Sequence, residues 1–316
     1  MRAYLGQRLA AMGLTLLGVS LLVFGMVRLI PGTVVEQLLG QAAIASPEVL
    51  AAFRRFFGLD RPLHVQYMDW LAGVVRADFG VSWLSGRSVL ALFLERLPVS
   101  AELAVLAVGW SLLLGLPLGT ASAVWRGTRR DGAIRVLATL GLSLPAFWQG
   151  TVLILLFSVY FGWMPSLQWV PFTRNPAANL AIMALPALTL GTATAAMITR
   201  MARSSMLDVL GREYVRTARA KGLHEGHVTF RHALRNALIP VVTVAGVQLG
   251  YIVGGLVVVE DVFTLPGVGR LLLDAIFQRD YPVVQGVILI LATAFMLLNL
   301  AVDLLYAVLD PRLRHG

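Results

Sequence analysis

Long apolar stretches alternate with shorter polar ones along nearly the whole chain, a pattern typical of proteins that cross a membrane several times. An α-helix needs about 20 apolar residues to cross roughly 30 Å of hydrocarbon. Stretches of that length cover approximately residues 9–30, 98–124, 134–160, 180–202, 236–259 and 284–309. The sequence therefore predicts an all-α integral membrane protein with six transmembrane helices. No small-residue cleavage pattern follows the first stretch, which we interpret as a retained span.

Arginines in the short loops predict the orientation, because basic residues of short loops stay on the cytoplasmic side. The loop after the second span and the C-terminal tail are both rich in them: Arg126, Arg129, Arg130 and Arg135, then Arg312 and Arg314. Residues 31–96 instead hold six basic and six acidic residues, without net charge. We expect both termini in the cytoplasm and residues 31–96 outside.

The external segment 31–96 is too polar to span a membrane, and residues 49–57 and 65–75 space their apolar side chains as amphipathic helices do. Two interpretations remain open: the segment fills space between spans, or it receives a partner or covers the mouth of a pathway. A further surface helix is expected over residues 268–277, after the Pro266-Gly267 turn. The predicted divisions are residues 1–30, the external segment 31–96, and a core of five spans, 97–316.

Prolines and glycines interrupt the predicted spans. A proline removes a helical N–H donor and can kink a membrane helix where neighbours satisfy the freed carbonyl. Four prolines are therefore candidates for helix kinks or for lining a pathway: Pro117, Pro145, Pro186 and Pro240. Glycines in the second, third and fifth spans favour close helix packing, because small residues let backbones approach.

Composition narrows the possible functions. The chain is 58% hydrophobic and only 14% charged, and its net charge of +9 fits cytoplasmic loops better than a nucleic-acid surface. It has no cysteine, which excludes disulfides, thiolate metal sites and cysteine nucleophiles. Its five histidines lie in loops without the three-ligand pattern of a catalytic metal site. We expect no nucleic-acid binding and no bound metal or cofactor.

No source of catalysis or energy is evident in the chain itself. It lacks the G-x-S-x-G motif of serine hydrolases, and its only lysine, Lys221, lies between Ala220 and Gly222 rather than in a P-loop. Ion-driven transport usually leaves ionisable residues deep in the spans. Only Glu102 and Asp303 qualify, so an ion-coupled secondary transporter is a distant alternative.

Residues 200–240 form a basic loop between two spans, with eight basic residues against three acidic ones. Residues 216–221 can form an exposed basic helix, which Gly222 can end by adopting a left-handed conformation. On charge alone, these cations could simply anchor the loop to anionic lipid. The alternative is that the loop docks on a partner protein, since the chain has no nucleotide-binding motif of its own.

The loop sequence EYVRTARAKGLHEGHVTFRHALRNALIPVV resembles the cytoplasmic loop of binding-protein-dependent ABC importer permeases. When the family's E-A-A…G signature is aligned on Gly222, Arg216-Thr217-Ala218 takes the E-A-A place and only Ala218 matches. R-T-A-R-A-K-G-L and R-H-A-L-R-N-A-L-I-P are similar to the form found in the dipeptide, oligopeptide and nickel subfamily. LGLDRPLHVQYMDWL, ADFGVSW and the C-terminal NLAVDLLYAVLDPRLR are similar to its B-type subunit, so the resemblance covers nearly the whole chain.

The resemblance implies a permease subunit with the type I ABC importer fold in the inner membrane of a prokaryote. Its partners would be a paralogous second permease subunit, two cytoplasmic ATPases that bind ATP and Mg, and an external solute-binding protein. The substrate would be a peptide, with nickel or a metal chelate as the alternative. The coupling helix of the family, which moves the spans when the ATPases close, would lie in a cytoplasmic loop at about 203–235 and comprise Arg216, Thr217, Ala218, Arg219, Ala220, Lys221, Gly222 and Leu223.

Overall fold

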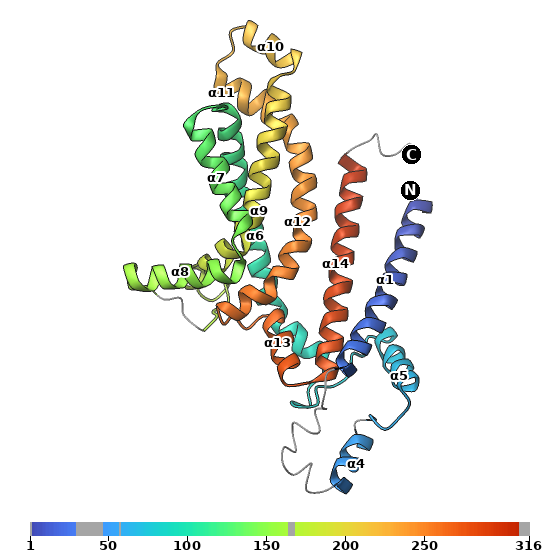
Figure 1. Ribbon diagram of the computed structural model, residues 1–316. Coiled ribbons are helices and arrows are strands. Elements are labelled where there is room, and N and C mark those ends of the chain that lie inside the picture. The colour runs from blue at the N-terminus through green and yellow to red at the C-terminus, as the bar shows by residue number, and fades with distance from the viewer. Residues whose placement is uncertain (1, 30–46, 57, 164–167, 310–316) are drawn as a thin grey trace. The chain divides into compact units, whose positions relative to one another are not determined.

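The computed structural model describes residues 2–29, 47–56, 58–163 and 168–309 (Figure 1). Over these residues the chain is helical, with no strand beyond an isolated bridge between Val81 and Ser88. The predicted all-α class is confirmed. The chain divides into two compact units, Met1–Pro98 with Pro266–Gly316, and Val99–Leu265. We call them the terminal unit and the central unit.

The terminal unit contains α1 (Arg2–Leu29), α4 (Pro47–Phe56), α5 (Leu63–Val75), the first turns of α6 (Val89–Val124), α13 (Val268–Phe277) and α14 (Tyr281–Leu309). The long helices α1 and α14 run side by side (Figure 1). In its core, apolar side chains from the start of α6 pack with apolar side chains of α13 and α14. The buried members include Val89, Phe93, Val268, Val284 and Val287.

The short surface helices agree with the amphipathic pattern in the sequence. The segments predicted at 49–57 and 65–75 are α4 and α5, and the segment predicted at 268–277 is α13 with those same bounds. Residues 31–46 and 57 of the external segment, and the tail with Arg312 and Arg314, lie outside the described residues.

The central unit contains the rest of α6, α7 (Arg129–Ser143), α8 (Ala146–Phe161), α9 (Pro176–Leu210), α10 (Glu213–Ala220), α11 (Glu225–His227), the π-helix η1 (Val228–Leu234) and α12 (Arg235–Val262). The helix α9 packs against α7, α8 and α12. Buried side chains from α6, α9 and α12 form the main core, including Leu103, Met183 and Val259. The unit is therefore built around α9.

Glycines let α6 and α9 approach closely. A Cβ atom added to Gly119 would lie 2.6 Å from the Thr199 carbonyl oxygen, and one added to Gly191 would lie 2.7 Å from the Ala107 carbonyl oxygen. Gly115 is similarly crowded against Ile198, at 2.7 Å. The packing interpretation is confirmed for Gly115 and Gly119. Gly109 differs, because a Cβ there would meet open space.

The segment expected to be one span over residues 134–160 is two helices, α7 and α8, bent by 110° at a short break. The cause is Pro145, which precedes α8 and disfavours helical geometry in Leu144. Leu144 is extended, with φ −82° and ψ 125°. The stretch is therefore divided into two helices at Pro145, one of the prolines expected to kink a span.

Among the described residues, four helices are long and apolar enough to cross a membrane: α1, α6, α9 and α14. The number rises to six if α7 with α8, and the two parts of α12, each form one span. The bend of 41° in α12 falls between Gln248 and Gly250, whereas Pro240 lies earlier in the helix. Pro117 and Pro186 lie inside α6 and α9, which run without a break.

Candidate functional site

A short helix and a glycine turn connect α9 to the second half of the central unit. The helix α10 begins at Glu213, three residues before the predicted start, and ends at Ala220. Gly222 then adopts φ +76°, a left-handed conformation that side chains disfavour. Its N–H donates to the Arg219 carbonyl at 2.9 Å, while the Leu223 N–H donates to the Ala218 carbonyl at 3.4 Å. The predicted helix end at Gly222 is thus confirmed.

The two faces of α10 differ sharply. Val215 and Ala218 are buried in a small apolar cluster with Val228 of η1, against Val209 and Leu210 at the end of α9. Ala218 is therefore an anchor on the inner face. The other residues of the predicted coupling element are exposed: Arg216, Thr217, Arg219, Ala220, Lys221, Gly222 and Leu223.

Acidic neighbours pair with the arginines of this helix. Arg216 forms an ion pair with Glu213 at 2.9 Å, and Arg219 forms one with Glu225 at 2.8 Å. From Glu213 to Glu225 the chain carries three cations and two acids, for a net charge of +1. Attraction to anionic lipid grows with the number of cations near the surface, so this near-neutral element is a weak lipid anchor.

The exposed rim of α10 also carries apolar surface. Leu223 and Tyr214 are 39% and 44% exposed, and the Tyr214 hydroxyl is held by a hydrogen bond from Asn236 Nδ2 at 3.0 Å. A Cβ atom added to Gly222 would meet nothing within 4 Å. Apolar side chains ringed by paired charges suit docking to a protein surface.

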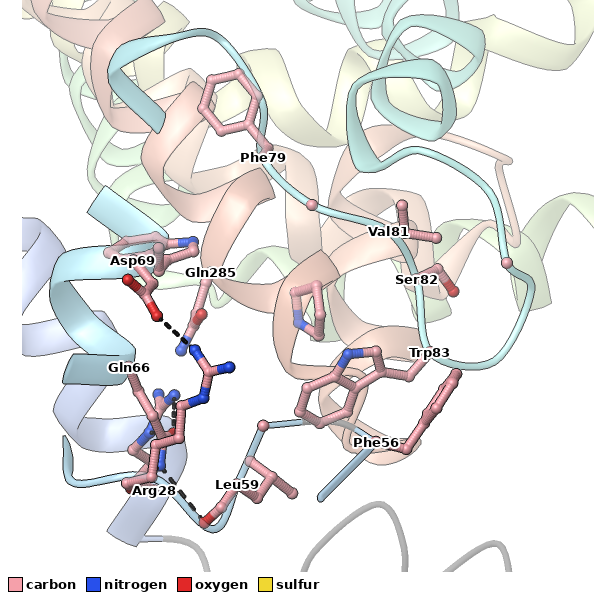
Figure 2. Close-up of a pocket in the computed structure, with 16 residues that line it drawn as sticks. Arg28, Phe56, Leu59, Gln66, Asp69, Phe79, Val81, Ser82, Trp83 and Gln285 are labelled. Atoms are coloured by element: carbon pink, nitrogen blue, oxygen red, sulfur yellow. Dashed lines mark hydrogen bonds and ion pairs between the residues drawn. The ribbon is translucent and has the colours of Figure 1, made fainter. Parts of the chain in front are cut away.

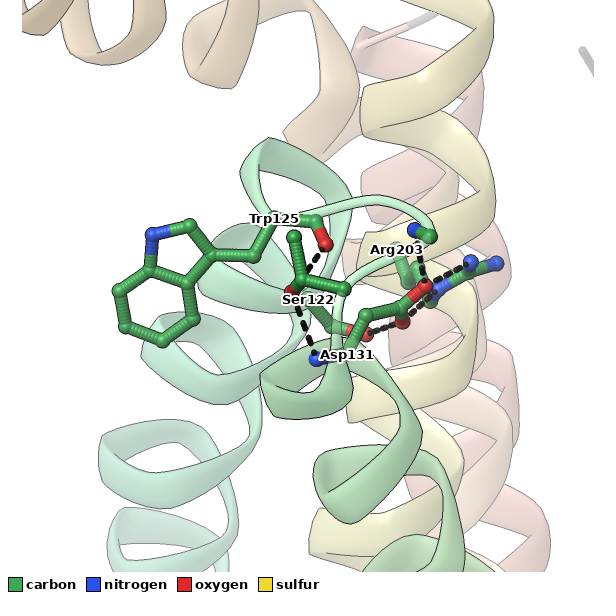
Figure 3. A network of polar contacts seen from close by, with 6 residues as sticks. Ser122, Trp125, Asp131 and Arg203 are labelled. Atoms are coloured by element: carbon green, nitrogen blue, oxygen red, sulfur yellow. Dashed lines mark hydrogen bonds and ion pairs between the residues drawn. The ribbon is translucent and has the colours of Figure 1, made fainter.

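A buried ion pair fixes the segment that leads to this loop (Figure 3). Arg203 of α9 donates to both carboxylate oxygens of Asp131 in α7, from Nε and from its terminal nitrogen, at 2.9 Å each. Asp131 also accepts from the Ser122 hydroxyl at 2.6 Å and from the Gly127 N–H at 3.1 Å. The network joins α6, the loop after it, α7 and α9. These contacts hold α9 rigidly at the point from which it continues to α10.

Asp131 is not among the candidate residues that the sequence pattern indicated. A local signal was present, since Thr128 and Asp131 have the spacing of a capping box. The Thr128 hydroxyl does accept from the Asp131 N–H, at 3.4 Å. The partner Arg203 lies 72 positions away and leaves no such local signal.

Of the two ionisable candidates in the spans, only Glu102 has a described side chain. Glu102 accepts from Trp169 Nε1 at 3.2 Å. The fully buried Glu260 of α12 accepts from the Ser100 hydroxyl at 2.5 Å. The side chain of Asp303 lies outside the described residues. The histidines are near one another in one place, where the rings of His227 and His232 are 5.6 Å apart. Across the described part of the chain, no three His, Asp or Glu side chains cluster as metal ligands would.

Comparisons with known proteins extend over the whole chain. Residues 115–315 match the family described as "Binding-protein-dependent transport system inner membrane component", and residues 1–104 match the corresponding N-terminal family. The chain is 43% identical over 312 residues to the glutathione transport system permease protein GsiC of Salmonella typhimurium (strain LT2), with 99% of each chain covered. It is 42% identical over 338 residues to the dipeptide transport system permease protein DppB of Escherichia coli (strain K12). It is 40% identical over 335 residues to the di/tripeptide transport system permease protein DppB of Pseudomonas aeruginosa (strain UCBPP-PA14).

Each of the two DppB alignments covers 100% of this chain and 99% of the relative. The similarity therefore includes the loop with Gly222 as well as the predicted spans. Together with the apolar helices, it identifies a multi-pass protein of a bacterial inner membrane. The chain belongs to the family of inner membrane components of binding-protein-dependent transport systems.

Proposed function

We propose that this chain is a permease subunit of an ABC importer for short peptides and forms half of the translocation pathway. The observation that carries the proposal is sequence identity of 40–43%, over 99–100% of this chain, to permeases named for glutathione, dipeptides and di/tripeptides. These substrates share a peptide backbone and a free carboxylate. No nucleotide-binding motif is present in the chain, so the energy must come from partner subunits that bind ATP and Mg.

In the proposed topology the chain crosses the membrane six times, with both termini in the cytoplasm. The two bent helix pairs supply the third and fifth spans along the chain. The arginines between α6 and α7 favour a cytoplasmic position for that loop. Residues 31–96 carry equal numbers of basic and acidic residues, which favours a position outside. A paralogous permease subunit would complete the pathway, and a solute-binding protein would deliver the peptide from outside.

Within this topology, α10 is the proposed coupling helix. Its exposed face would dock on a cytoplasmic ATPase, and its buried face would transmit movement to α9 through Val215 and Ala218. The ion pair between Arg203 and Asp131 supports this role, because it makes the base of α9 rigid. A rigid lever is needed if closure of the ATPases is to move the spans.

The coupling role can be tested with Gly222→Trp. Apart from its own chain neighbours, no described residue has an atom within 4 Å of the added Cβ position, so the large side chain would meet mainly a docked partner. We expect the complex to insert normally, while ATP-driven uptake of labelled dialanine into proteoliposomes falls about tenfold or more, the equivalent of about 1.4 kcal/mol.

Two controls separate docking from backbone strain. Gly222→Asn keeps a residue that tolerates the left-handed region and should retain most of the uptake. Gly162→Trp places the same side chain at another left-handed glycine, with φ +59°, where no described atom beyond the chain neighbours lies within 4 Å of the added Cβ position, and it should also transport normally. Normal uptake by Gly222→Trp would refute the coupling role. Uptake of Ni²⁺ but not of dialanine by the unmodified complex would refute the peptide assignment.

A further inference from the structure

The terminal unit contains a pocket of about 550 Å³ at one end of its long helices (Figure 2). It lies between the last turn of α1, the helix α5, the segment 79–86 and the first turns of α14. This is the end of α1 opposite Arg2, so the proposed topology places its opening outside the membrane. We call it the α5–α14 pocket. Its volume is in the range of sites that hold small ligands.

Two polar groups that line the pocket have no hydrogen-bond partner among the described residues. Gln285 is only 4% exposed, and its Nε2 atom donates to nothing there. The same holds for the buried Nε1 atom of Trp70. Both are donors, and buried donors without a partner are costly and uncommon in folded proteins. Their presence in the lining of one pocket indicates a ligand that supplies acceptors.

The charges around the pocket point to an anionic acceptor. Arg28 donates to the Gln66 side-chain oxygen at 2.9 and 3.3 Å and to the Phe24 carbonyl at 3.1 Å, so within the described chain its hydrogen bonds go to neutral oxygens. Arg61 and Asp69 form an ion pair at 3.0 Å, and both are 61% exposed. The lining therefore holds two guanidinium groups and one carboxylate, and the excess charge is positive.

Aromatic and aliphatic side chains complete the pocket. Figure 2 shows the rings of Trp83 and Phe56 on one side, away from the polar group formed by Gln285, Asp69 and Gln66. A ligand that suits both sides carries a carboxylate next to an apolar group. A short peptide has this chemistry at its C-terminal residue, where the carboxylate and the side chain share one carbon atom.

We propose that the α5–α14 pocket binds the C-terminal carboxylate of a short peptide through Gln285, Trp70 and Arg28. The inference rests on the proposed function, which it deepens by assigning a recognition site to the free carboxylate. Acceptors from the peptide satisfy the two unpartnered donors, while its negative charge balances Arg28. A peptide with an amidated C-terminus loses both the charge and one acceptor, so it binds poorly.

The test measures binding of dialanine and dialaninamide to the full permease–ATPase complex in nanodiscs, without the solute-binding protein, by titration calorimetry. Dialaninamide binds about tenfold more weakly or worse, because charge-assisted hydrogen bonds are lost. Gln285→Met, which keeps the length of the side chain but removes its amide, weakens dialanine binding by a similar factor. Gln285→Met also leaves the midpoint of thermal unfolding unchanged or raises it, because the Nε2 atom that it removes has no partner among the described residues.

A matched control is Gln149→Met in the central unit, where the Gln149 amide donates to the Thr192 hydroxyl at 2.8 Å. This variant loses a hydrogen bond that is present in the folded protein, so its unfolding midpoint falls while dialanine binding is unchanged. Equal binding of dialanine and dialaninamide overturns the proposal, and so does unchanged binding by Gln285→Met. If dialanine does not bind and Gln285→Met instead weakens docking of the solute-binding protein, the pocket receives an acidic side chain of that protein and the proposal is wrong.

The experiments distinguish a failure of the carboxylate site from a failure of the proposed transport function. ATP-driven dialanine uptake that does not respond to Gln285→Met or to C-terminal amidation overturns the carboxylate site and leaves the transport function intact. Binding of dialanine that depends on Gln285, without any ATP-driven uptake in the presence of the solute-binding protein, supports the site and overturns the transport function.

Discussion

Arg203 of α9 binds both carboxylate oxygens of Asp131 in α7, with each nitrogen–oxygen distance at 2.9 Å. The side chains are 22% and 4% exposed, so the pair is largely shielded from water. The Ser122 hydroxyl and the Gly127 N–H also donate to the carboxylate. Such a fully satisfied, bidentate pair fixes the relative position of two helices more strongly than an exposed ion pair does.

Replacing Asp131 with Asn should therefore destabilise the central unit. The amide cannot accept at both positions, and the guanidinium of Arg203 would be left without its countercharge. We expect the free energy of unfolding to fall by about 2–4 kcal/mol. Denaturant titration of the purified protein in mild detergent measures the change.

The matched control is Glu95→Gln, which breaks the exposed pair between Arg87 and Glu95, where the side chains are 53% and 55% exposed. Its cost should stay below about 1 kcal/mol. Equal costs for the two variants would show that burial adds nothing to the pair at Asp131.

Close packing of α6 on α9 predicts opposite effects for two glycines of the same helix. In Gly119→Ala the new methyl group would overlap the Thr199 carbonyl and the Ala202 side chain, so the loss should be about 1–3 kcal/mol. In Gly109→Ala the methyl group meets open space, and the helix should gain up to about 1 kcal/mol from the better helix former. Thermal unfolding of both variants in the same detergent checks the difference in sign.

Local patterns predicted the local structure well. Pro266 and Gly267 cannot extend a helix easily, and α13 begins at the next residue as expected. Gly222 is the residue that most easily takes a left-handed turn, and it does so at φ +76°. In each case the controlling residues lie within one turn of the feature that they determine.

Features set by distant residues were not predictable from one sequence. The position of Pro145 inside a predicted span indicated a possible kink. The size of the bend, 110°, also depends on how α7 packs on α9 and how α8 packs on α9 and α12. The α5–α14 pocket brings Gln285 next to residues of α5 more than 200 positions away in the sequence. An isolated Gln in an apolar span gives no indication of such a partner until the helices are placed.

A second buried carboxylate controls the loop that forms one wall of the α5–α14 pocket. Asp280, only 3% exposed, accepts from the Ser82 hydroxyl at 2.5 Å and from the Trp83 N–H at 3.1 Å. In Asp280→Asn one of these donors loses an acceptor, so the loop should open more often. We expect hydrogen exchange at the Trp83 amide to rise about tenfold, measured by mass spectrometry of the segment 79–88.

A control from the same loop is Asp78→Asn. Asp78 accepts from the Gly80 N–H at 2.9 Å in an exposed position, where water can replace the lost bond. Exchange at Trp83 should then stay near that of the unmodified protein. A similar rise in both variants would mean that the loop responds to any loss of charge rather than to the buried bonds of Asp280.

The attachment of α10 to α9 gives a direct test of how the loop is held. Val215 is fully buried in the cluster with Val209, Leu210 and Val228, so Val215→Asp would place an unpaired carboxylate among apolar side chains. Burying that charge costs more than the small cluster can supply, and α10 should detach from α9. Trypsin should then cut after Arg216, Arg219 and Lys221 about tenfold faster or more, because a detached helix is accessible to proteases.

Thr217→Asp adds the same carboxylate on the exposed face of α10, where it needs no burial, and should leave the cleavage rate nearly unchanged. If Val215→Asp were as resistant as Thr217→Asp, the apolar cluster would not be what holds α10, and the Arg219–Glu225 ion pair and the Asn236–Tyr214 hydrogen bond would be the attachments to test next.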